Sequence, residues 1–502
     1  MMKKYDDIVI GSGISGLTAA LMLAQNGRKV LLLEKSSTLG GSISRFYKKD
    51  IPFDVGFHFT AALSENEILA SMLSVLGIKD RIKPLFMYGA ETNSIVFENG
   101  CAKFNIPSGM QNFRMALKKR FQNDIEAIDS YMNFIERIYD ETVTFDLKNI
   151  NQLNSRIDED YIALDEALDK LTDNECLKSI LASYCTCHGT KPSEISYANH
   201  CRIAAAFYKS MARVVDGGDA FVNAFRDQFS LLGVDICLNT FIEKFIYSEK
   251  KRVDGCVLNT GKTVCVDNYI FAIHPNEILK ILPSECLSRG FVNRINDFEP
   301  STGFFSLYCV LDDIEPDIAF VPSMSTLYSN CDLNGILGSK NSDFTTLIIF
   351  KNIETDKNGR RCFILNVLET SCIEDVSDWS ETQQGSRSQD YYLYKKNREK
   401  KIIERVFNLY PEYRGKLEIV DSASILTYRD YLNSYDGAAY GIKQKIGQFN
   451  LFGRLPIRNV YAIGQSSVLP GVVGAMLSSF MQVRTILGVE TYNRYIERRA
   501  DN

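Results

Sequence analysis

The sequence predicts an α/β protein in which a Rossmann-like nucleotide-binding domain is interleaved with a second, α+β domain. Three observations near the start of the chain support this fold. An apolar strand pattern at 8–10 leads directly into the glycine motif GSGISG at 11–16, a helical pattern then runs to Gly27, and a second apolar strand pattern ends at Glu34. These are the parts of a dinucleotide-binding βαβ unit in the required order.

Each residue of the glycine motif has its own physical role. Gly11 allows the tight turn, Gly13 lets the backbone approach a pyrophosphate, and Gly16 lets the helix pack closely on the strand. The first helical turn, which includes Ile14 and Ser15, offers free N–H groups and the positive end of the helix dipole. The motif therefore predicts a site for the phosphates of a dinucleotide.

Glu34 lies eighteen residues after Gly16, at the end of the second strand. A carboxylate at this place binds the ribose hydroxyls and repels a 2′-phosphate. The sequence thus favours FAD or NAD over NADP.

Length and composition limit the classes of protein that this chain can be. With 502 residues, 45 % hydrophobic and 24 % charged, it has ordinary globular composition. A net charge of −5 without a basic stripe makes nucleic acid an unexpected partner. No stretch approaches the roughly 18 apolar residues of a spanning helix. The strand pattern starts too early for a secretory leader, and the 13 scattered cysteines fit reduced thiols, so we expect a cytoplasmic protein.

Two near-matches to known site motifs predict no metal and no second phosphate site. Cys185, Cys187 and His188 form C-x-C-H, which lacks the C-x₂-C pairs of a zinc site. Residues 255–263 have five residues between their glycines, where a phosphate-binding loop has four, so a strand, a turn and a strand are expected. His200 lies in an apolar helical pattern and is expected to be a hydrogen-bonded core residue.

The chain resembles the FAD-dependent oxidoreductases of the phytoene desaturase, carotenoid isomerase and retinol saturase group, within the amine-oxidase-like flavoproteins. The resemblance rests on GSGISG at 11–16, Glu34, LGG at 39–41 and FDVG at 53–56, and it covers most of the chain. It implies FAD as the cofactor. Among the motif residues outside the glycine turn, it implies that FAD contacts Lys35, Gly40, Gly41, Ser42, Asp54 and Gly56.

Further segments are similar to the same family. Gly217 and Gly218 match its glycine pair before a helix, although Val214 to Asp216 stand where the family commonly has a proline. The resemblance implies that the backbone near Ile242 passes the adenine.

The last flavin motif of the family is matched by NVYAIGQSSVLPGVVGAMLSSFM at 459–481. The resemblance implies that the closing helix directs its N-terminus at the flavin pyrimidine ring, where its dipole and free N–H groups stabilise negative charge. It implies FAD contacts for Gly464, Gln465, Gly471, Val472 and Val473. Gln465 departs from the family, which often has an acid there, but its amide can still donate or accept a hydrogen bond.

The motifs divide the chain into interleaved domains. We expect the FAD-binding domain at 1–74, 205–285 and 446–502, and the substrate-binding domain at 75–204 and 286–445. A second G-x-G-x-x-G motif followed by an acid is absent from the sequence. A reductant, either a nicotinamide or a redox partner, is therefore expected to reach the flavin from the substrate side.

Two residues are candidates for catalysis. His58 follows F-D-x-G, and in the saturase branch of the family this pattern continues to a histidine. His58 could bond the flavin edge or protonate a substrate carbon, since a histidine pKa lies near neutral, or it could only brace the turn. Tyr440 could face the flavin or pack at a strand end. His274 is expected to be a loop residue near the adenine.

The function that follows is an FAD-dependent oxidoreductase acting on a hydrophobic polyene, isoprenoid or lipid-like substrate. Hydride transfer at flavin N5 would saturate, desaturate or isomerise a carbon–carbon double bond, and it needs few protein acids. The sequence leaves the direction open. The alternatives are an amine or porphyrinogen oxidase that uses oxygen, and a non-catalytic prenyl-binding escort protein of the same fold. The helical pattern at 124–143 is expected to pack in the core. As an alternative, its aromatic-rich face lines a pocket or contacts a membrane surface peripherally.

Overall fold

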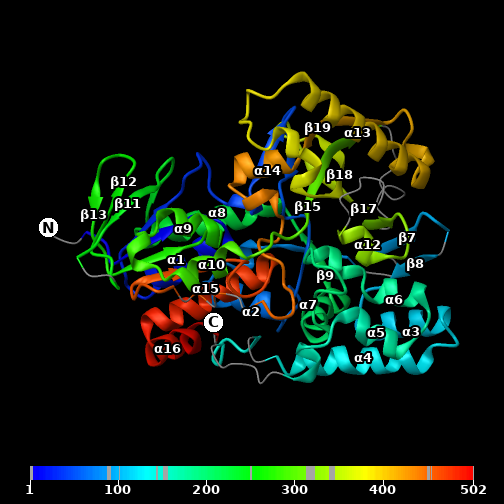
Figure 1. Cartoon of the computed structure of the whole chain (residues 1–502), viewed down its shortest axis with the longest axis horizontal. Coiled ribbons are helices and arrows are strands. Elements are labelled where there is room, and N and C mark those ends of the chain that lie inside the picture. Colours follow the sequence, from blue (N-terminus) through cyan, green and yellow to red (C-terminus); the bar gives the residue numbers. More distant parts are fainter. Residues whose placement is uncertain are drawn as a thin grey trace.

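The computed structural model describes residues 4–87, 92–100, 102–142, 145–150, 157–248, 251–312, 323–338, 345–448, 451, 453 and 455–500. Its elements form two main sheets with helices around them, which confirms the mixed α/β class (Figure 1). The nucleotide-binding motifs lie on the left of Figure 1. The larger sheet lies on the right, with helices α3 to α6 below it.

The first sheet is parallel and has five strands in the order β10-β2-β1-β14-β20. The strands are β10 (Asp235–Cys237), β2 (Val30–Leu33), β1 (Asp7–Ile10), β14 (Asn268–Phe271) and β20 (Val460–Ala462). Its central strands are short apolar runs buried on both faces, as is typical of parallel sheets covered on each side. These strands come from the beginning, the middle and the end of the chain.

Alternate residues of these strands face two different layers. Val9, Leu32 and Ile270 pack against helices on one face. The helices are α1 (Ile14–Gln25), α8 (Gly217–Leu232) and α15 (Gly471–Leu487), with α2 (Ile68–Leu76) and α16 (Val489–Ala500) outside them. Ile8, Leu31 and other alternate residues pack against the opposite layer. That layer contains the antiparallel sheet β11 (Ile242–Ile246), β12 (Gly255–Leu258) and β13 (Thr263–Val264), with α9 (Pro275–Ile281) and α10 (Arg289–Asn296).

The second sheet has seven strands in the order β19-β15-β18-β17-β16-β7-β8 and is antiparallel except between β16 and β7. The strands are β19 (Leu417–Ala423), β15 (Gly303–Leu311), β18 (Arg361–Ser371), β17 (Thr346–Thr355), β16 (Met324–Tyr328), β7 (Asn93–Phe97) and β8 (Lys103–Ile106). One face is covered by α13 (Gln389–Leu409), whose Ile402 and Val406 pack on Leu307, Leu347 and other strand residues.

The opposite face of this sheet, which we call the inner face, turns toward the helical region and the nucleotide-binding motifs. The helical region contains α3 (Met110–Arg120), α4 (Ile125–Asp140), α5 (Leu164–Leu171), α6 (Glu175–Leu181), the 3₁₀ turn η5 (Ser183–Cys187) and α7 (Tyr197–Lys209). Phe304, Phe350 and Leu368 of the inner face share one apolar cluster with α4 and α7. The site lies where this face meets the flavin motifs.

Small elements connect the two sheets. They are the hairpin β3 (Arg45–Lys48) and β4 (Ile51–Asp54), the sheet β5 (Thr60–Ala61), β9 (Met211–Val214) and β6 (Pro84–Phe86), and the helices α12 (Leu333–Gly338) and α14 (Ile425–Leu432). Among the described residues, no helix combines the length and apolar character needed to cross a membrane.

The details of the predicted elements agree closely with those observed. The strand, turn and strand expected at 255–263 are β12 and β13, paired antiparallel. The parallel sheet draws its strands from the three segments assigned to FAD, and the seven-stranded sheet from the two assigned to substrate. The division into two domains stays a prediction.

Candidate flavin and substrate site

The glycine turn after β1 has the shape that a bound diphosphate requires. Gly11 has φ +97°, and a Cβ on Gly16 would lie 1.9 Å from the Gly11 carbonyl oxygen, so only glycine fits either position. A Cβ on Gly13 would meet no protein atom within 4 Å, so that side of the turn is open. Helix α1 begins at Ile14 without a side-chain cap, so its first N–H groups are available to an anion.

The Glu34 carboxylate is held in one orientation beside this turn. It accepts hydrogen bonds from the Ser12 N–H at 2.8 Å, the Ser12 hydroxyl at 2.6 Å and the Ser36 N–H at 2.7 Å. The Thr240 N–H donates to the Glu34 carbonyl at 2.9 Å, which brings the start of β11 at Ile242 to the same place. Since a carboxylate has about four acceptor positions, capacity remains for ribose hydroxyls.

The glycine pair Gly40 and Gly41 packs against the glycine turn at 11–16. The Gly40 N–H donates to the Ser12 carbonyl at 3.1 Å, and Gly40 forms an isolated bridge with Gly13. A Cβ on Gly41 would lie 3.4 Å from the Cα of Gly13, and one on Gly56 would lie 3.1 Å from the Ser42 carbonyl oxygen. The structure therefore brings these predicted contacts together.

The Lys35 side chain is exposed and directed to a side-chain partner. Its ammonium donates to the Asn433 side-chain oxygen at 2.9 Å.

The last flavin motif packs directly against α1. The Gly464 N–H donates to the Ser478 hydroxyl at 2.7 Å, and a Cβ on Gly464 would lie 3.5 Å from the Ser15 hydroxyl. The Ser479 hydroxyl donates to the Ser15 carbonyl at 2.8 Å. The buried serines of α15 thus fix it beside α1.

The N-terminus of α15 has no side-chain cap, and its contact with the flavin stays a prediction. The helix begins at Gly471, and its N-cap, Pro470, provides no side-chain hydrogen bond. Val472 and Val473 are partly exposed. The Gln465 amide donates to the Ala439 carbonyl at 3.3 Å and thereby connects this motif to the segment that carries Tyr440.

Asp54 belongs to a buried ion cluster that the sequence did not reveal. Its carboxylate accepts from Arg45 at 2.6 Å and Arg213 at 3.5 Å, and both arginines also pair with Glu354, at 2.7 and 3.2 Å. A Cβ on Gly217 would lie 2.4 Å from an Asp54 oxygen, so this glycine makes room for the cluster. Because both Asp54 oxygens bind arginines, the observed role of Asp54 is to join β4 to β9 and β17; its contact with FAD stays a prediction.

His58 lies beside this cluster on the inner face of the larger sheet. Its ring stacks on Phe350, with centroids 4.8 Å apart, and its Nδ1 is 3.5 Å from the Asn366 side-chain nitrogen. Burial lowers the pKa of His58 to about 4, and the nearby arginines add to this effect while Asp54 opposes it. The near-neutral pKa that we expected is therefore wrong, and His58 is a neutral hydrogen-bonding group.

Two buried carboxamides beside His58 have unused hydrogen-bonding atoms. Asn352 and Asn366 are fully buried. Within the part of the chain that the structure describes, three of their atoms have no hydrogen-bond partner: both polar atoms of the Asn352 side chain and the Asn366 oxygen. Asn366 pairs across the strands with Phe350, and Asn352 lies two residues further along on the same face. An unsatisfied buried polar group costs about 1–3 kcal/mol, so this arrangement indicates a place for a hydrogen-bonding ligand.

Aromatic side chains form the rest of this region, and we call them the aromatic wall: Phe59, Phe207, Phe304, Phe350 and Tyr440. The Phe59 ring is 5.4 Å from Phe350 and 5.5 Å from Phe207, and the Phe304 ring is 6.3 Å from Tyr440. All five belong to or pack against one apolar cluster. Burial raises the pKa of the Tyr440 hydroxyl, so this group stays protonated. The predicted catalytic residues His58 and Tyr440 thus lie at the same aromatic wall.

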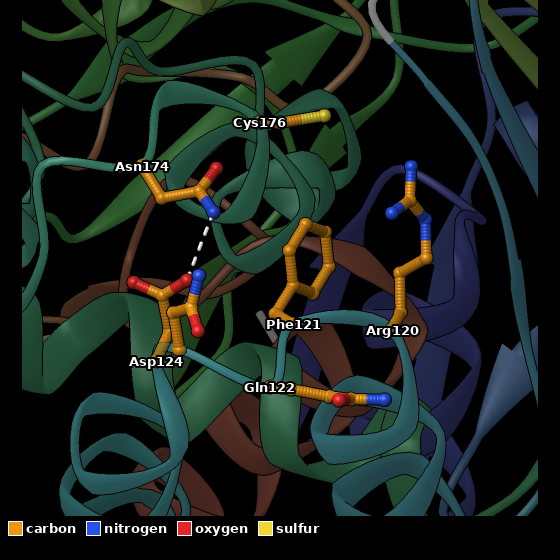
Figure 2. Close-up of a pocket in the computed structure, with 7 residues that line it drawn as sticks. Arg120, Phe121, Gln122, Asp124, Asn174 and Cys176 are labelled. Carbon is orange, nitrogen blue, oxygen red and sulfur yellow. Dashed lines mark hydrogen bonds between the residues drawn. The ribbon is translucent and has the colours of Figure 1, made fainter.

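A separate surface pocket of about 310 Å³ lies between α3, α4 and α6 (Figure 2). Figure 2 shows Asp124 and Asn174 directed toward each other, and the Asn174 amide donates to Asp124 at 2.9 Å. Asp124 also accepts from the Thr172 hydroxyl at 2.5 Å. The pocket contains none of the predicted site residues, and we assign it no function.

Comparison with known proteins identifies the family. Residues 14–306, more than half of the chain, match the flavin containing amine oxidoreductases. The chain belongs to this family. It is an FAD-dependent oxidoreductase, as the sequence predicted, and the open Gly13 side of the turn and the two uncapped helix N-termini fit an FAD molecule.

Similar proteins support the narrower resemblance. The all-trans-retinol 13,14-reductase of Macaca fascicularis is 23 % identical over 537 residues, which cover 98 % of this chain and 87 % of that protein. The chloroplastic prolycopene isomerase of Daucus carota is 30 % identical over 162 residues, 30 % of this chain and 24 % of that protein. The cyclohexylamine oxidase of Brevibacterium oxydans has the same fold, with a TM-score of 0.62, 13 % identity and 99 % of each chain covered.

Several residues of this amine oxidoreductase site were missed in the sequence. They are the cluster partners Arg45, Arg213 and Glu354 and the carboxamides Asn352 and Asn366. The available signal was a polar residue at an inward position of an otherwise apolar strand, as in TLIIFKNIET at 346–355 and RCFILNVLETS at 361–371.

Proposed function

We propose that the protein saturates, desaturates or isomerises a carbon–carbon double bond in a hydrophobic polyene, isoprenoid or lipid-like substrate. The observation that carries this proposal is the aromatic wall, in which Phe304 and Phe350 of the inner face pack with Phe59, Phe207 and Tyr440 from other segments. Aromatic and apolar side chains are the usual lining of sites for such ligands.

The relatives support the same substrate class. Their names describe one enzyme that reduces all-trans-retinol at the 13,14 bond and another that isomerises prolycopene.

FAD, when bound, supplies hydride transfer at its N5 position. The chain itself orients the double bond by means of the aromatic wall and excludes water from it. His58 is neutral at physiological pH, so it donates or accepts a hydrogen bond there and does not deliver a proton as an imidazolium. Saturation consumes a hydride and a proton, with both electrons of the hydride coming from a reductant, whereas isomerisation leaves the electron count unchanged.

The unused atoms of Asn352 and Asn366 extend the proposal to the shape of the substrate. Asn366 lies beside His58, and Asn352 lies two residues beyond Phe350 on the same face, at the edge of the aromatic wall. A substrate with a long apolar body and one polar end would fill both parts of this surface. We therefore favour an alcohol or carboxylate terminus over a pure hydrocarbon.

Two further interactions remain part of this proposal. Electrons come from a nicotinamide or a redox partner that approaches from the substrate side. The protein acts at or near a membrane surface, from which an apolar substrate would be drawn.

The test is a single-turnover assay with the FAD-loaded protein, reduced anaerobically with dithionite and mixed with all-trans-retinol or prolycopene. Mass spectrometry should find a product two mass units heavier for saturation, or an isomer of unchanged mass for isomerisation. The oxidised protein is tested for a product two mass units lighter. Steady hydrogen peroxide production from a simple amine such as cyclohexylamine, with no polyene product, would contradict the proposal.

A further inference from the structure

Three buried donor atoms meet in the helical region, away from the ion cluster of Asp54. Cys185 lies in the turn η5, His188 follows it, and His200 lies on α7. The Cys185 sulfur is 3.7 Å from His200 Nδ1, and His188 Nε2 is 3.3 Å from the same nitrogen. All three atoms lie within 4.8 Å of one another, and all three residues are fully buried.

The orientation of His200 suits a metal ligand. Its Nε2 is 3.1 Å from the Leu181 carbonyl oxygen, which can only accept, so Nε2 carries the hydrogen. The lone pair of Nδ1 therefore points at Cys185 and His188. A carbonyl that fixes the tautomer of a histidine in this way is the usual outer partner of a metal-bound imidazole.

The spacing of the donors agrees with a shared metal ion. With metal–nitrogen bonds of about 2.0–2.1 Å and a metal–sulfur bond of about 2.3 Å, a trigonal ion with three ligands places two nitrogens about 3.6 Å apart and nitrogen and sulfur about 3.8 Å apart. The two observed separations are 3.3 and 3.7 Å. The Cys185 and His188 donors lie within 4.8 Å of each other, so a movement of about 1 Å at this pair would let all three bind one ion.

The charge of the three donors favours a monovalent metal ion over a divalent one. Among the described residues, no Asp or Glu offers a ligand atom to this cluster, so one thiolate is the largest negative charge it can supply. A monovalent ion with one thiolate and two neutral imidazoles has no net charge, whereas a divalent ion would leave a positive charge buried, which is costly. Zinc also prefers four ligands in a closed structural site. Thiolate and imidazole suit Cu(I), which is soft.

We propose that Cys185, His188 and His200 form a binding site for Cu(I). Binding forms one Cu–S and two Cu–N bonds and releases the thiol proton of Cys185, with no change of oxidation state. The site lies directly behind the aromatic wall, because a Cβ on Gly189, the residue after His188, would lie 3.2 Å from the Tyr440 ring. The ion would have a structural role and would stabilise the packing behind this wall. The C-x-C-H motif thus contributes Cys185 and His188, and His200 completes the set from a distant segment.

The test measures copper directly and does not depend on turnover. The FAD-loaded protein is titrated anaerobically with Cu(I) against the chelator bathocuproine disulfonate. We expect one Cu(I) per chain in the wild type and a loss of at least tenfold in affinity in C185A and H188Q. The matched control is C187A, because Cys187 is a buried thiol of the same motif that lies outside the cluster. C187A should bind Cu(I) like the wild type.

The FAD absorbance of each variant reports whether it folds, so a variant without copper but with FAD supports the proposal. Three results would overturn it: no copper bound by the wild type against the chelator, equal copper in C185A and the wild type, or equal losses in C185A and C187A. Preferential binding of zinc at equal concentration would also overturn it, since the charge argument selects a monovalent ion.

Discussion

At the scale of single residues, His58 shows how burial changes the chemistry that a sequence motif implies. The motif places a histidine next to the flavin segment, where a near-neutral pKa would allow proton transfer. The structure encloses the ring between Phe350, Asn366 and the arginines, and burial lowers its pKa to about 4. A histidine in such a position orients a substrate or cofactor atom through a hydrogen bond.

Replacing His58 tests this role. H58A should retain FAD and lose about 10²-fold in kcat/KM, the usual effect of removing one positioned hydrogen-bonding group. H58Q, which keeps a polar side chain, should recover part of the loss. The measurement is polyene turnover at several pH values in variants of matched FAD content.

Between pH 6 and 8 the wild-type profile should show no titration of His58. An inflection near pH 6.5 that is present in the wild type and absent in H58Q would show that His58 acts as an acid or base. Unchanged turnover in H58A would leave His58 only the role of bracing the turn.

Glu34 gives the second test at this scale. E34R removes a carboxylate that is oriented by Ser12 and Ser36 and faces the site for the ribose, so the purified variant should be colourless. E34Q should bind FAD about 10- to 100-fold more weakly, since a hydrogen bond to a charged group contributes about 1.5–3 kcal/mol. The ratio of flavin to protein absorbance measures both effects.

Glu243 provides the control for Glu34, because it is exposed on β11 in the same part of the molecule. E243R should remain yellow. Normal flavin content in E34R would refute the assignment of Glu34.

At the scale of secondary-structure elements, the success of sequence reasoning depended on how local the signal was. The unit β1, α1 and β2 was predicted with its glycines and its acid, because all its parts lie within 34 consecutive residues and each has a fixed geometric role. The ion cluster was not predicted, because Arg45, Arg213 and Glu354 come from strands far apart in the chain. A single sequence records which residues are polar, but not which strands will pair.

The same contrast applies to the cluster of Cys185, His188 and His200. The spacing of Cys185 and His188 predicts no metal, because it lacks the C-x₂-C pairs of a zinc site. The sequence alone does not show that α7 brings His200 to them. The open side of the glycine turn, by comparison, could be predicted from Gly13 itself.

The glycine turn offers a test that separates folding from FAD binding. A Cβ on Gly13 meets no protein atom within 4 Å, and Gly13 has φ −61° and ψ 172°, which alanine adopts without strain. G13A should therefore fold with an unchanged melting temperature in the absence of FAD, while its Cβ enters the space for the diphosphate and weakens FAD binding by at least tenfold. Titration of the apoprotein with FAD measures this loss.

Substitutions at two other glycines serve as comparisons for G13A. G16A should destabilise the apoprotein itself, because its Cβ would collide with the Gly11 carbonyl. G290A, at an exposed site of α10 with no atom within 4 Å of its Cβ, should leave FAD binding unchanged and should not destabilise the apoprotein, because alanine favours a helix more than glycine does. Wild-type FAD affinity in G13A would show that the diphosphate does not lie on that side of the turn.

At the scale of the whole molecule, charged groups sit at the junction of the two sheets. Arg45 and Asp54 come from the hairpin of β3 and β4, Arg213 from β9 and Glu354 from the larger sheet. All four side chains are at most 10 % exposed. Removing one partner of such a group leaves an uncompensated charge and typically costs about 3–5 kcal/mol. The orientation of the inner face toward the flavin motifs therefore depends on these four residues together.

The burial of His58 at this junction predicts how stability depends on pH. Its pKa is about 4 in the folded protein and would return to about 6.5 on unfolding, so the unfolded state binds more protons between these values. The stabilisation that neutral His58 contributes should thus be fully present above about pH 6.5. The free energy of unfolding should fall as the pH decreases toward 4. The contribution of one such histidine is on the order of 3 kcal/mol across this window. Asp54, Arg45 and Arg213 face the ring, and mutation of His58 leaves their mutual pairing in place.

Urea unfolding of the wild type and of H58Q at pH 7.5, 6.0 and 5.0 measures this dependence. The comparison uses the slope of stability with pH, so a constant stability difference between the two proteins does not affect it. H58Q should lose stability less steeply below pH 6.5, because glutamine does not titrate. Parallel slopes in the two proteins would show that His58 can be protonated without unfolding. That result would mean that the junction admits water at His58, and it would restore His58 as a candidate proton donor for the substrate.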